Sequence, residues 1–496
     1  MNMNSRIFVV AAAGVLIGLA GGAYLWAGEK AVPAVAAAVQ ETPAPVQSAP
    51  QVQQARAVPQ SQAEMQLSFS AVVKEVTPSV VNVYATTVTQ QTASPFANDP
   101  FFQRYFGGDM FSQRPRESQS LGSGVIVDAT GVILTNHHVV TGATDIRVAT
   151  SDGHEYPVEL VLDDEKTDLA VLKVKDAKGA TFPAIAFADS DGLEVGDLVL
   201  AIGNPFGVGQ TVTSGIVSAL ARTGVESNNY EFFIQTDAAI NPGNSGGALV
   251  DIDGRLIGVN TAIFSQSGGS VGIGFAIPSN MARVVAEAGI SGGQLVRPWF
   301  GARMQDVSTD IADSIGLGTA HGALITEVAP GSTAERAGFK SGDVILSVDG
   351  FAIAQPSAFD FRLATKPVGS EVTITYHRAG KEASVKVKLE AAPGAGQAVA
   401  MSGNTRFAGT TVETVTAATA QDLGLPFAAR GVLVREVASG SPADQMGLRP
   451  GDIILSLNGR DVTDAESFRS IADARPESWQ IVLDRGGRTI RAVVGG

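Results

Sequence analysis

Three residue types that together can cleave a peptide bond stand in separate segments of the chain. The pair His137 and His138 lies in LTNHHVV, Asp168 lies in KTDLAVLKV, and Ser245 lies in INPGNSGGALV. A serine hydroxyl is a weak nucleophile that needs a neighbouring base, and a histidine that titrates near neutral pH suits that role. A carboxylate fixes the imidazole tautomer and stabilises the imidazolium. The set predicts Ser245 as nucleophile, one histidine as base and Asp168 as its partner.

The glycines around Ser245 indicate how the backbone could serve this reaction. Gly243 permits a sharp turn, so that the N–H groups of Gly243 and Ser245 can point into one oxyanion hole. The predicted hole comprises Gly243, Asn244 and Ser245. Gly246 and Gly247 leave room for the substrate to approach.

Two other interpretations of these motifs are disfavoured. The string GNSGG also fits the nucleophile elbow of α/β hydrolases, but that fold has a helix after the serine and the triad order Ser, Asp, His. Here an apolar run at 248–250 meets a turn at 251–254 and a second apolar run, which predicts a hairpin. The histidine pair has no HExxH pattern or cysteine beside it, and a strand would direct His137 and His138 to opposite sides. We expect no metal site.

At these motifs the chain resembles a known family. Four segments resemble those of the HtrA (Do/DegP/DegQ) periplasmic serine endoproteases, namely TNHHVV, TDLAVLKV, INPGNSGGALV and, after them, VGIGFAIPS. The resemblance covers nearly everything after residue 66. The family's catalytic histidine directly precedes a Val-Val or Val-Ile pair, which implies that His138 is the base. Family members often have Asn where this chain has His137. The resemblance implies a serine endopeptidase with a triad of His138, Asp168 and Ser245.

Composition excludes several other classes of function. The formal charge of −14 argues against a nucleic-acid partner, because phosphate binding needs concentrated Lys and Arg. The absence of cysteine excludes disulfides, thiolate catalysis and cysteine-ligated zinc. No Walker A string is present, since Lys381 after Gly380 is followed by Glu and Ala. We expect no cofactor and no ATP-driven unfolding.

From 67 to 280 the chain has the pattern of short strands. Branched residues fill runs such as 79–84, 124–128 and 132–135, and Gly, Asp or Asn turns separate them. About 210 residues of this pattern predict a mainly β unit, a chymotrypsin-like double β-barrel serine protease domain. A long polar insertion at 88–121 also carries aromatic residues, which suggests a docking surface.

The rest of the chain repeats itself. Residues 322–350 and 431–459 align without a gap at an offset of 109. The copies look like α+β PDZ domains, which we place at 281–392 and 404–496 with a linker at 393–403. PDZ domains hold the C-terminal carboxylate of a peptide against backbone N–H groups. The resemblance places these loops at Trp299, Phe300, Gly301 and Ala302 in the first copy and at Phe407, Ala408, Gly409 and Thr410 in the second.

The first 66 residues predict export. Arg6 precedes an apolar run at 7–27, which as a helix would be about 31 Å long. Residues 1–28 are therefore either a cleaved signal peptide or an uncleaved anchor in the inner membrane, and both alternatives place the rest in the periplasm. Residues 29–66 are rich in Ala, Pro and Gln and predict a disordered linker.

Residues near the nucleophile predict the substrate preference. Ala239 and Ile240, just upstream of it, carry no charge, and Val271, Ile273 and Phe275 are expected to form the facing wall. These residues predict a small apolar pocket for Val, Ala, Ile or Thr at the cleaved residue, and the family resemblance implies the same preference.

The expected partners are other proteins. Unfolded or misfolded exported proteins and C-terminal peptides suit a protease that carries PDZ-like domains. The resemblance also implies a homotrimer or a larger assembly. A non-enzymatic alternative stays open, in which a periplasmic chaperone or scaffold binds exposed termini through its PDZ-like domains and proteolysis is secondary.

Overall fold

The computed structural model describes most of the chain after residue 67. The described residues are 68–89, 116–177, 179–204, 209–222, 232–241, 243–263, 272–292, 295–392, 398–474 and 476–495. The predicted signal or anchor, the linker at 29–66 and most of the aromatic insertion lie outside them. Within these ranges, no helix is both long and apolar enough to cross a membrane.

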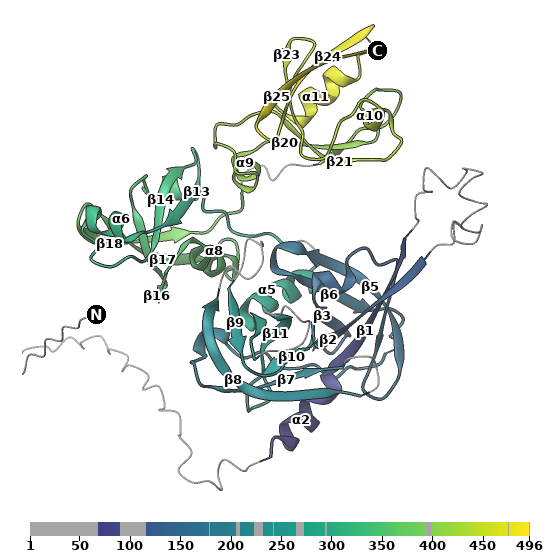
Figure 1. The fold of residues 1–496 in the computed structure, drawn as a ribbon, viewed down its shortest axis with the longest axis vertical. Helices are drawn as coiled ribbons and strands as arrows, with labels where there is room; N and C mark the ends of the chain where they lie inside the picture. Colours follow the sequence, from purple (N-terminus) through teal and green to yellow (C-terminus); the bar gives the residue numbers. More distant parts are fainter. Residues whose placement is uncertain are drawn as a thin grey trace, which may run out of the picture. The chain divides into compact units, whose positions relative to one another are not determined.

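Two closed six-stranded barrels make up the first part of the described chain (Figure 1). The first has the strand order β1-β2-β3-β6-β5-β4 and consists of β1 (Val80–Thr89), β2 (Arg116–Asp128), β3 (Val132–Thr135), β4 (Asp145–Ala149), β5 (Glu155–Asp164) and β6 (Leu169–Val174). The second has the order β10-β11-β12-β9-β8-β7 and consists of β7 (Leu198–Gly203), β8 (Thr211–Arg222), β9 (Phe233–Thr236), β10 (Ala248–Val250), β11 (Leu256–Ile263) and β12 (Gly274–Pro278). The predicted double barrel of the mainly β class is confirmed.

Apolar side chains join the two barrels. Val80 and Val125 of the first barrel share one buried cluster with Leu200 and Ala248 of the second. Because interiors of this kind are close-packed, the cluster holds the barrels in one relative position. The segment after β3, the turn before β6 and the turn before β10 carry the predicted catalytic residues, so their positions are fixed together.

The local structure around the catalytic motifs agrees with the sequence in one place and differs in another. β10 and β11 pair antiparallel, so the hairpin predicted after Ser245 is confirmed. The strand considered for the histidine pair in the argument against a metal site is not formed, because α4 (His137–Val140) is a single helical turn. Val139 and Val140 both belong to the core of the first barrel. A strand would have sent these neighbours to opposite faces, whereas the helical turn buries both.

The first domain extends past the boundary that we predicted at residue 280. α5 (Ser279–Ile290) continues directly from β12. Its buried residues Met281 and Val285 pack in one cluster with Val132 of the first barrel and Val259 of the second. The helix is therefore part of the core that both barrels share.

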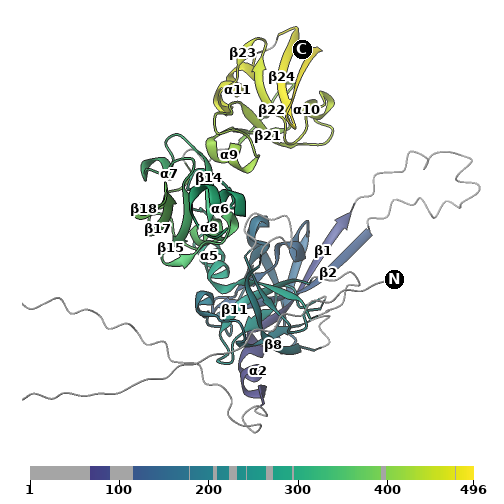
Figure 2. The same ribbon diagram turned by 60° about the vertical axis from the view of Figure 1, so that its left-hand side comes forward.

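The two C-terminal repeats have corresponding elements (Figures 1 and 2). The first consists of β13 (Ala302–Asp306), α6 (Thr309–Ile315), β14 (Ala323–Val328), α7 (Thr333–Arg336), β15 (Val344–Val348), β16 (Phe351–Ala352), α8 (Pro356–Ala364), β17 (Glu371–Arg378) and β18 (Lys381–Lys388). The second consists of β19 (Val399–Ala400), β20 (Thr410–Thr414), α9 (Ala417–Asp422), β21 (Val432–Val437), α10 (Pro442–Gln445), β22 (Ile453–Leu457), β23 (Arg460–Asp461), α11 (Ala465–Ala472), β24 (Ser478–Arg485) and β25 (Arg488–Gly495). β19 has no counterpart in the first sheet, whose order begins at β13.

Each repeat contains the same ion pair between a partly exposed arginine and a buried carboxylate. Arg378 donates from Nε and Nη2 to Asp343 at 2.5 Å each, and Arg485 donates in the same way to Asp452 at 2.6 Å each. The exposed fractions of the two carboxylate side chains are 2% and 0%. The bidentate hydrogen bonds therefore compensate for the loss of water around each carboxylate.

We expect Arg378→Ala and Arg485→Ala each to lower the free energy of unfolding of its repeat by about 2 kcal/mol, because each leaves a buried carboxylate without its charged partner. The matched control is Lys386→Ala, which breaks an exposed pair with Glu371. That change should cost less than about 0.5 kcal/mol. Urea unfolding of the full chain measures the three losses, and equal losses would contradict this role of the two ion pairs.

Candidate active site

His138 and Asp168 face each other at the junction of α4 and β6. His138 Nδ1 is 2.9 Å from both carboxylate oxygens of Asp168, and its backbone N–H donates to Oδ1 at 3.1 Å. An ionised carboxylate can only accept hydrogen bonds, so Nδ1 is the donor. In the neutral ring this leaves Nε2 unprotonated, as a general base requires.

The backbone of Asp168 is held as closely as its side chain. Asp168 follows the 3-10 turn η3 (Glu165–Thr167) with φ 53° and ψ 38°, in the left-handed region that Asp adopts more readily than most residues. Its carbonyl oxygen accepts hydrogen bonds from Asn136 Nδ2 at 2.9 Å and from the His137 N–H at 3.1 Å. The histidine segment and the aspartate turn are thus bonded through main chain and side chain.

The protonation state of Asp168 follows from its surroundings. Burial alone would raise the pKa of this carboxyl. Hydrogen bonds from His138 and Thr261, together with the charge of His138, outweigh burial and hold the pKa below its usual value. Asp168 is therefore a carboxylate at neutral pH.

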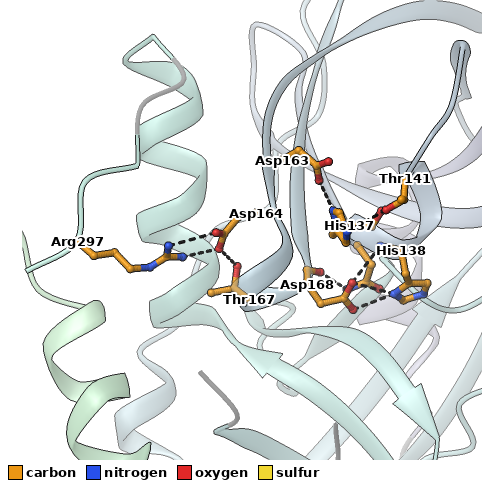
Figure 3. A network of polar contacts seen from close by, with 9 residues as sticks. His137, His138, Thr141, Asp163, Asp164, Thr167, Asp168 and Arg297 are labelled. Atoms are coloured by element: carbon orange, nitrogen blue, oxygen red, sulfur yellow. Dashed lines mark hydrogen bonds and ion pairs between the residues drawn. The ribbon is translucent and has the colours of Figure 1, made fainter. Parts of the chain in front are cut away.

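His137 turns away from Asp168, as Figure 3 shows. Its Nδ1 is 2.6 Å from Asp163 Oδ1, and its Nε2 is 3.0 Å from the hydroxyl of Thr141. Consecutive residues of a helical turn point in different directions, so the two histidines have different partners. Of the two, His138 is the one whose ring pairs with the predicted catalytic carboxylate.

An ion pair supports the turn that leads to Asp168 (Figure 3). Arg297 donates two hydrogen bonds to the Asp164 carboxylate, one of them from Nη1 to Oδ1 at 3.2 Å. The hydroxyl of Thr167 donates to the same carboxylate. Because Asp164 ends β5 and Thr167 ends η3, these bonds brace both sides of the turn.

Ser245 lies in the tight turn 243–247 before β10. Gly243 has φ 97°, a left-handed value that favours glycine. Within the described residues, the N–H groups of Gly243 and Ser245 donate to no protein acceptor. The N–H of Asn244 instead donates to the carbonyl oxygen of Asn241 at 2.9 Å. The Asn244 N–H is therefore engaged within the protein, and the N–H groups of Gly243 and Ser245 stay the candidates for the predicted oxyanion hole.

Thr261 in β11 contacts both Asp168 and Ser245, and the sequence analysis missed it. Its Oγ1 donates to Asp168 Oδ2 at 2.5 Å, and its carbonyl oxygen accepts from Ser245 Oγ at 2.9 Å. The available signal was the polar pair Asn260-Thr261 inside the apolar run LIGVNTAI. Buried polar side chains in a strand need hydrogen-bond partners, but their positions in the sequence do not identify those partners.

Comparison with known proteins decides the family. Residues 122–259 match the model of the trypsin-like peptidase domain, and residues 298–389 and 433–484 match PDZ domain models. The periplasmic serine endoprotease DegP of Escherichia coli (strain K12) is 41% identical over 401 residues, which cover 81% of this chain and 81% of DegP. The chain belongs to the HtrA family.

Further relatives agree with this assignment. The periplasmic pH-dependent serine endoprotease DegQ of the same organism is 40% identical over 425 residues, which cover 85% of this HtrA chain and 90% of DegQ. The solved HtrA-type protease AlgW with decapeptide is 44% identical, with a TM-score of 0.50, and the match covers 66% of this chain and 99% of AlgW. The chain is thus a serine endopeptidase, and the comparisons favour this function over the chaperone or scaffold alternative.

Most of the residues predicted to form the substrate pocket belong to, or pack against, the hydrophobic core of the protease domain. Ile240 belongs to the core of the second barrel, and Phe275 belongs to the cluster that both barrels share. Ile273 packs against that cluster and Ala239 is half-buried. Val271 lies outside the described residues. A pocket lined by these residues stays a prediction.

The two predicted carboxylate loops differ in their hydrogen bonds. In the first copy, the N–H groups of Phe300 and Gly301 donate to no acceptor among the described residues. In the second copy, the N–H groups of Ala408, Gly409 and Thr410 donate to the carbonyl oxygens of residues 405, 401 and 407 at 3.1, 2.9 and 3.2 Å. The second loop therefore uses its donors within its own domain, and the carboxylate-binding role of either loop stays a prediction.

We expect Thr261→Val to lower kcat about tenfold with KM within about twofold, since a hydrogen bond to a charged group contributes roughly 1.5 kcal/mol. Thr261→Ser, which keeps the hydroxyl, should retain most of the activity. Steady-state kinetics on a peptide substrate measure both variants. Equal activity of Thr261→Val and wild type would show that the Thr261 hydroxyl does not position Asp168 for the reaction.

Proposed function

We propose that Ser245, His138 and Asp168 are the nucleophile, the general base and the orienting carboxylate of this endopeptidase. The observation that carries the proposal is the pairing of His138 Nδ1 with Asp168 at 2.9 Å, because it leaves Nε2 as the proton acceptor. Thr261 links the same carboxylate to the Ser245 turn.

The reaction follows from these positions. Ser245 Oγ, which donates to the Thr261 carbonyl in the resting arrangement, turns to His138 Nε2 and attacks the substrate carbonyl carbon as its proton passes to Nε2. The N–H groups of Gly243 and Ser245 stabilise the negative oxygen that forms. His138 then gives the proton to the leaving amine, and water releases the acyl group by the same steps in reverse order.

The proposed substrates are unfolded or misfolded exported proteins, cleaved without ATP. Extended segments of such proteins can enter the site directly, and the sequence contains no Walker A string that would support ATP-driven unfolding. Uncharged Ala239 and Ile240 beside the nucleophile support cleavage after small apolar residues.

We place the enzyme in the periplasm, because DegP and DegQ are named periplasmic and because the segment at 7–27 has the pattern of an export signal or anchor. The family resemblance supports assembly into a homotrimer or a larger oligomer. Tethering through residues 7–27 depends on whether the segment stays uncleaved.

Peptide binding is assigned to the first PDZ domain. PDZ domains take a peptide as an added strand at the edge of the sheet. β13 is the edge strand of the first sheet and pairs only with β14 among the described strands. The unbonded N–H groups of Phe300 and Gly301 lie next to this edge and can receive a carboxylate.

The corresponding edge of the second PDZ domain is covered by the chain itself. β19 pairs antiparallel with β20, and the N–H of Met401 donates to the carbonyl oxygen of Thr410 at 2.7 Å. The carbonyl oxygen of Met401 accepts the Gly409 N–H at 2.9 Å. The Met401 side chain is buried in the domain core. Residues 399–401 therefore occupy the position of an added peptide strand, and we do not assign peptide binding to this copy.

The function is tested by incubating the purified enzyme with unfolded casein, with and without ATP, beside Ser245→Ala. We expect wild type to degrade casein equally in both conditions and Ser245→Ala to leave it intact. Mass spectrometry of the fragments should show Val, Ala, Ile or Thr at the cleaved residue. Degradation by Ser245→Ala would contradict the nucleophile, and cleavage mainly after Lys, Arg or Asp would contradict the pocket.

The difference between the PDZ domains is tested by Gly301→Ala and Gly409→Ala, which introduce the same clash in both copies. An added Cβ would lie 2.3 Å from the Ser332 Cβ in the first and 2.3 Å from the Ser441 Cβ in the second. Fluorescence anisotropy with a labelled peptide that ends in an apolar residue should show loss of binding for Gly301→Ala and little change for Gly409→Ala. The reverse pattern would contradict the assignment.

A further inference from the structure

A buried serine of the first barrel holds the turn that carries the nucleophile. Ser123 lies in β2, and none of its surface is exposed to solvent. Its hydroxyl donates to the carbonyl oxygen of Gly243 at 2.6 Å and accepts the N–H of Asn204 at 2.8 Å. Because Asn204 supplies the proton of one bond, the hydroxyl proton of Ser123 is directed to Gly243.

The first of these bonds fixes one peptide plane of the turn at both ends. The plane between Gly243 and Asn244 has its carbonyl oxygen bound by the Ser123 hydroxyl and its N–H bound by the carbonyl oxygen of Asn241 at 2.9 Å. A peptide plane held at both ends cannot rotate without breaking a buried hydrogen bond.

The backbone of Ser123 fixes a second plane in the same way. Its N–H donates to the carbonyl oxygen of Ser245 at 2.8 Å, while the N–H of Gly246 donates to the carbonyl oxygen of Asn260 at 2.8 Å. The plane between residues 245 and 246 is therefore also held at both ends. Among the described residues, the N–H groups of Gly243 and Ser245 have no protein acceptor, and they belong to the peptide planes that directly precede these two residues.

Ser123 is itself held by a hydrogen bond from β3 and packs closely against the turn. The hydroxyl of Thr135, at the end of β3, donates to the carbonyl oxygen of Ser123 at 2.7 Å. A Cβ added to Gly246 would lie 2.1 Å from that carbonyl oxygen. The strand and the turn are thus in backbone contact, which leaves the turn no room to shift toward Ser123.

We propose that Ser123 is a positioning residue for the oxyanion hole. Its hydroxyl sets the orientation of the plane that follows Gly243, and through the φ and ψ angles of Gly243 it sets the direction of the Gly243 N–H. This inference rests on the proposed roles of Ser245 and Gly243. It makes a residue 120 positions upstream of Gly243 responsible for orienting a donor that stabilises negative charge in the transition state.

The test compares wild type with Ser123→Ala in the full chain, using a peptide substrate and a peptidyl trifluoromethyl ketone. The ketone carbon bonds to Ser245 Oγ, the serine proton passes to His138, and the resulting oxyanion occupies the hole. We expect Ser123→Ala to lower kcat about tenfold and to raise the Ki of the ketone by about the same factor. KM and the affinity for a matching peptide without the ketone should stay within about twofold.

The matched control is Ser279→Ala. Ser279 is also fully buried, and its hydroxyl donates to the carbonyl oxygen of Ala188 at 2.9 Å, but it does not contact the turn. This variant should lower the Tm about as much as Ser123→Ala while leaving kcat and the Ki of the ketone unchanged. Ser123→Cys, which keeps a weaker donor in the same place, should have kcat and Ki between those of wild type and Ser123→Ala.

The outcomes separate this inference from the proposed function. If Ser123→Ala keeps kcat and Ki within about twofold of wild type, or loses activity only in proportion to the inactive fraction found by active-site titration, the positioning role is overturned. If Ser123→Ala fails to fold, Ser123→Cys decides, since wild-type kcat and Ki in that variant would overturn the role. Activity in Ser245→Ala would instead overturn the proposed nucleophile.

Discussion

The hydrogen bonds to the Asp168 carboxylate are the interaction on which the rest of the site depends. His138 approaches from the first barrel and Thr261 from the second, so one buried carboxylate ties together residues from both halves of the protease domain. The left-handed backbone of Asp168 and the two donors to its carbonyl oxygen fix where that carboxylate lies. Its ionised state, favoured by these bonds over the cost of burial, sets the tautomer of His138.

The position of Ser245 is set by contacts between the barrels. The turn is bonded to β2 of the first barrel through Ser123 and to β11 of its own barrel through Thr261 and Asn260. The apolar cluster that the two barrels share holds them at a fixed separation, so these hydrogen bonds keep their geometry. The positions of the catalytic residues are therefore determined by contacts between the two barrels more than by any single loop.

The sequence predicted the features that are local. The order histidine, aspartate, serine, the hairpin after the nucleophile and the repeat in the C-terminal half can be recognised from spacing and periodicity, whereas the choice of His138 over His137 came from the family resemblance. Thr261 lies 93 positions from Asp168 and Ser123 lies 120 positions from Gly243, and no spacing rule connects such pairs. The helical turn at His137–Val140 could not be predicted, because branched residues favour strands locally, whereas burial of both valines favours the helical turn. Likewise, the sequence similarity between the two repeats could not predict that β19 pairs with β20 and covers the edge of the second sheet.

Covalent labelling with a fluorophosphonate, followed by mass spectrometry of the peptides, tests the triad most directly. It reports which hydroxyl is activated and which of the two adjacent histidines activates it. The pairing of His138 with Asp168 predicts a single labelled residue, Ser245, with labelling retained in His137→Ala and lost in His138→Ala. Label on another residue, or labelling that depends on His137 and not on His138, would contradict the triad.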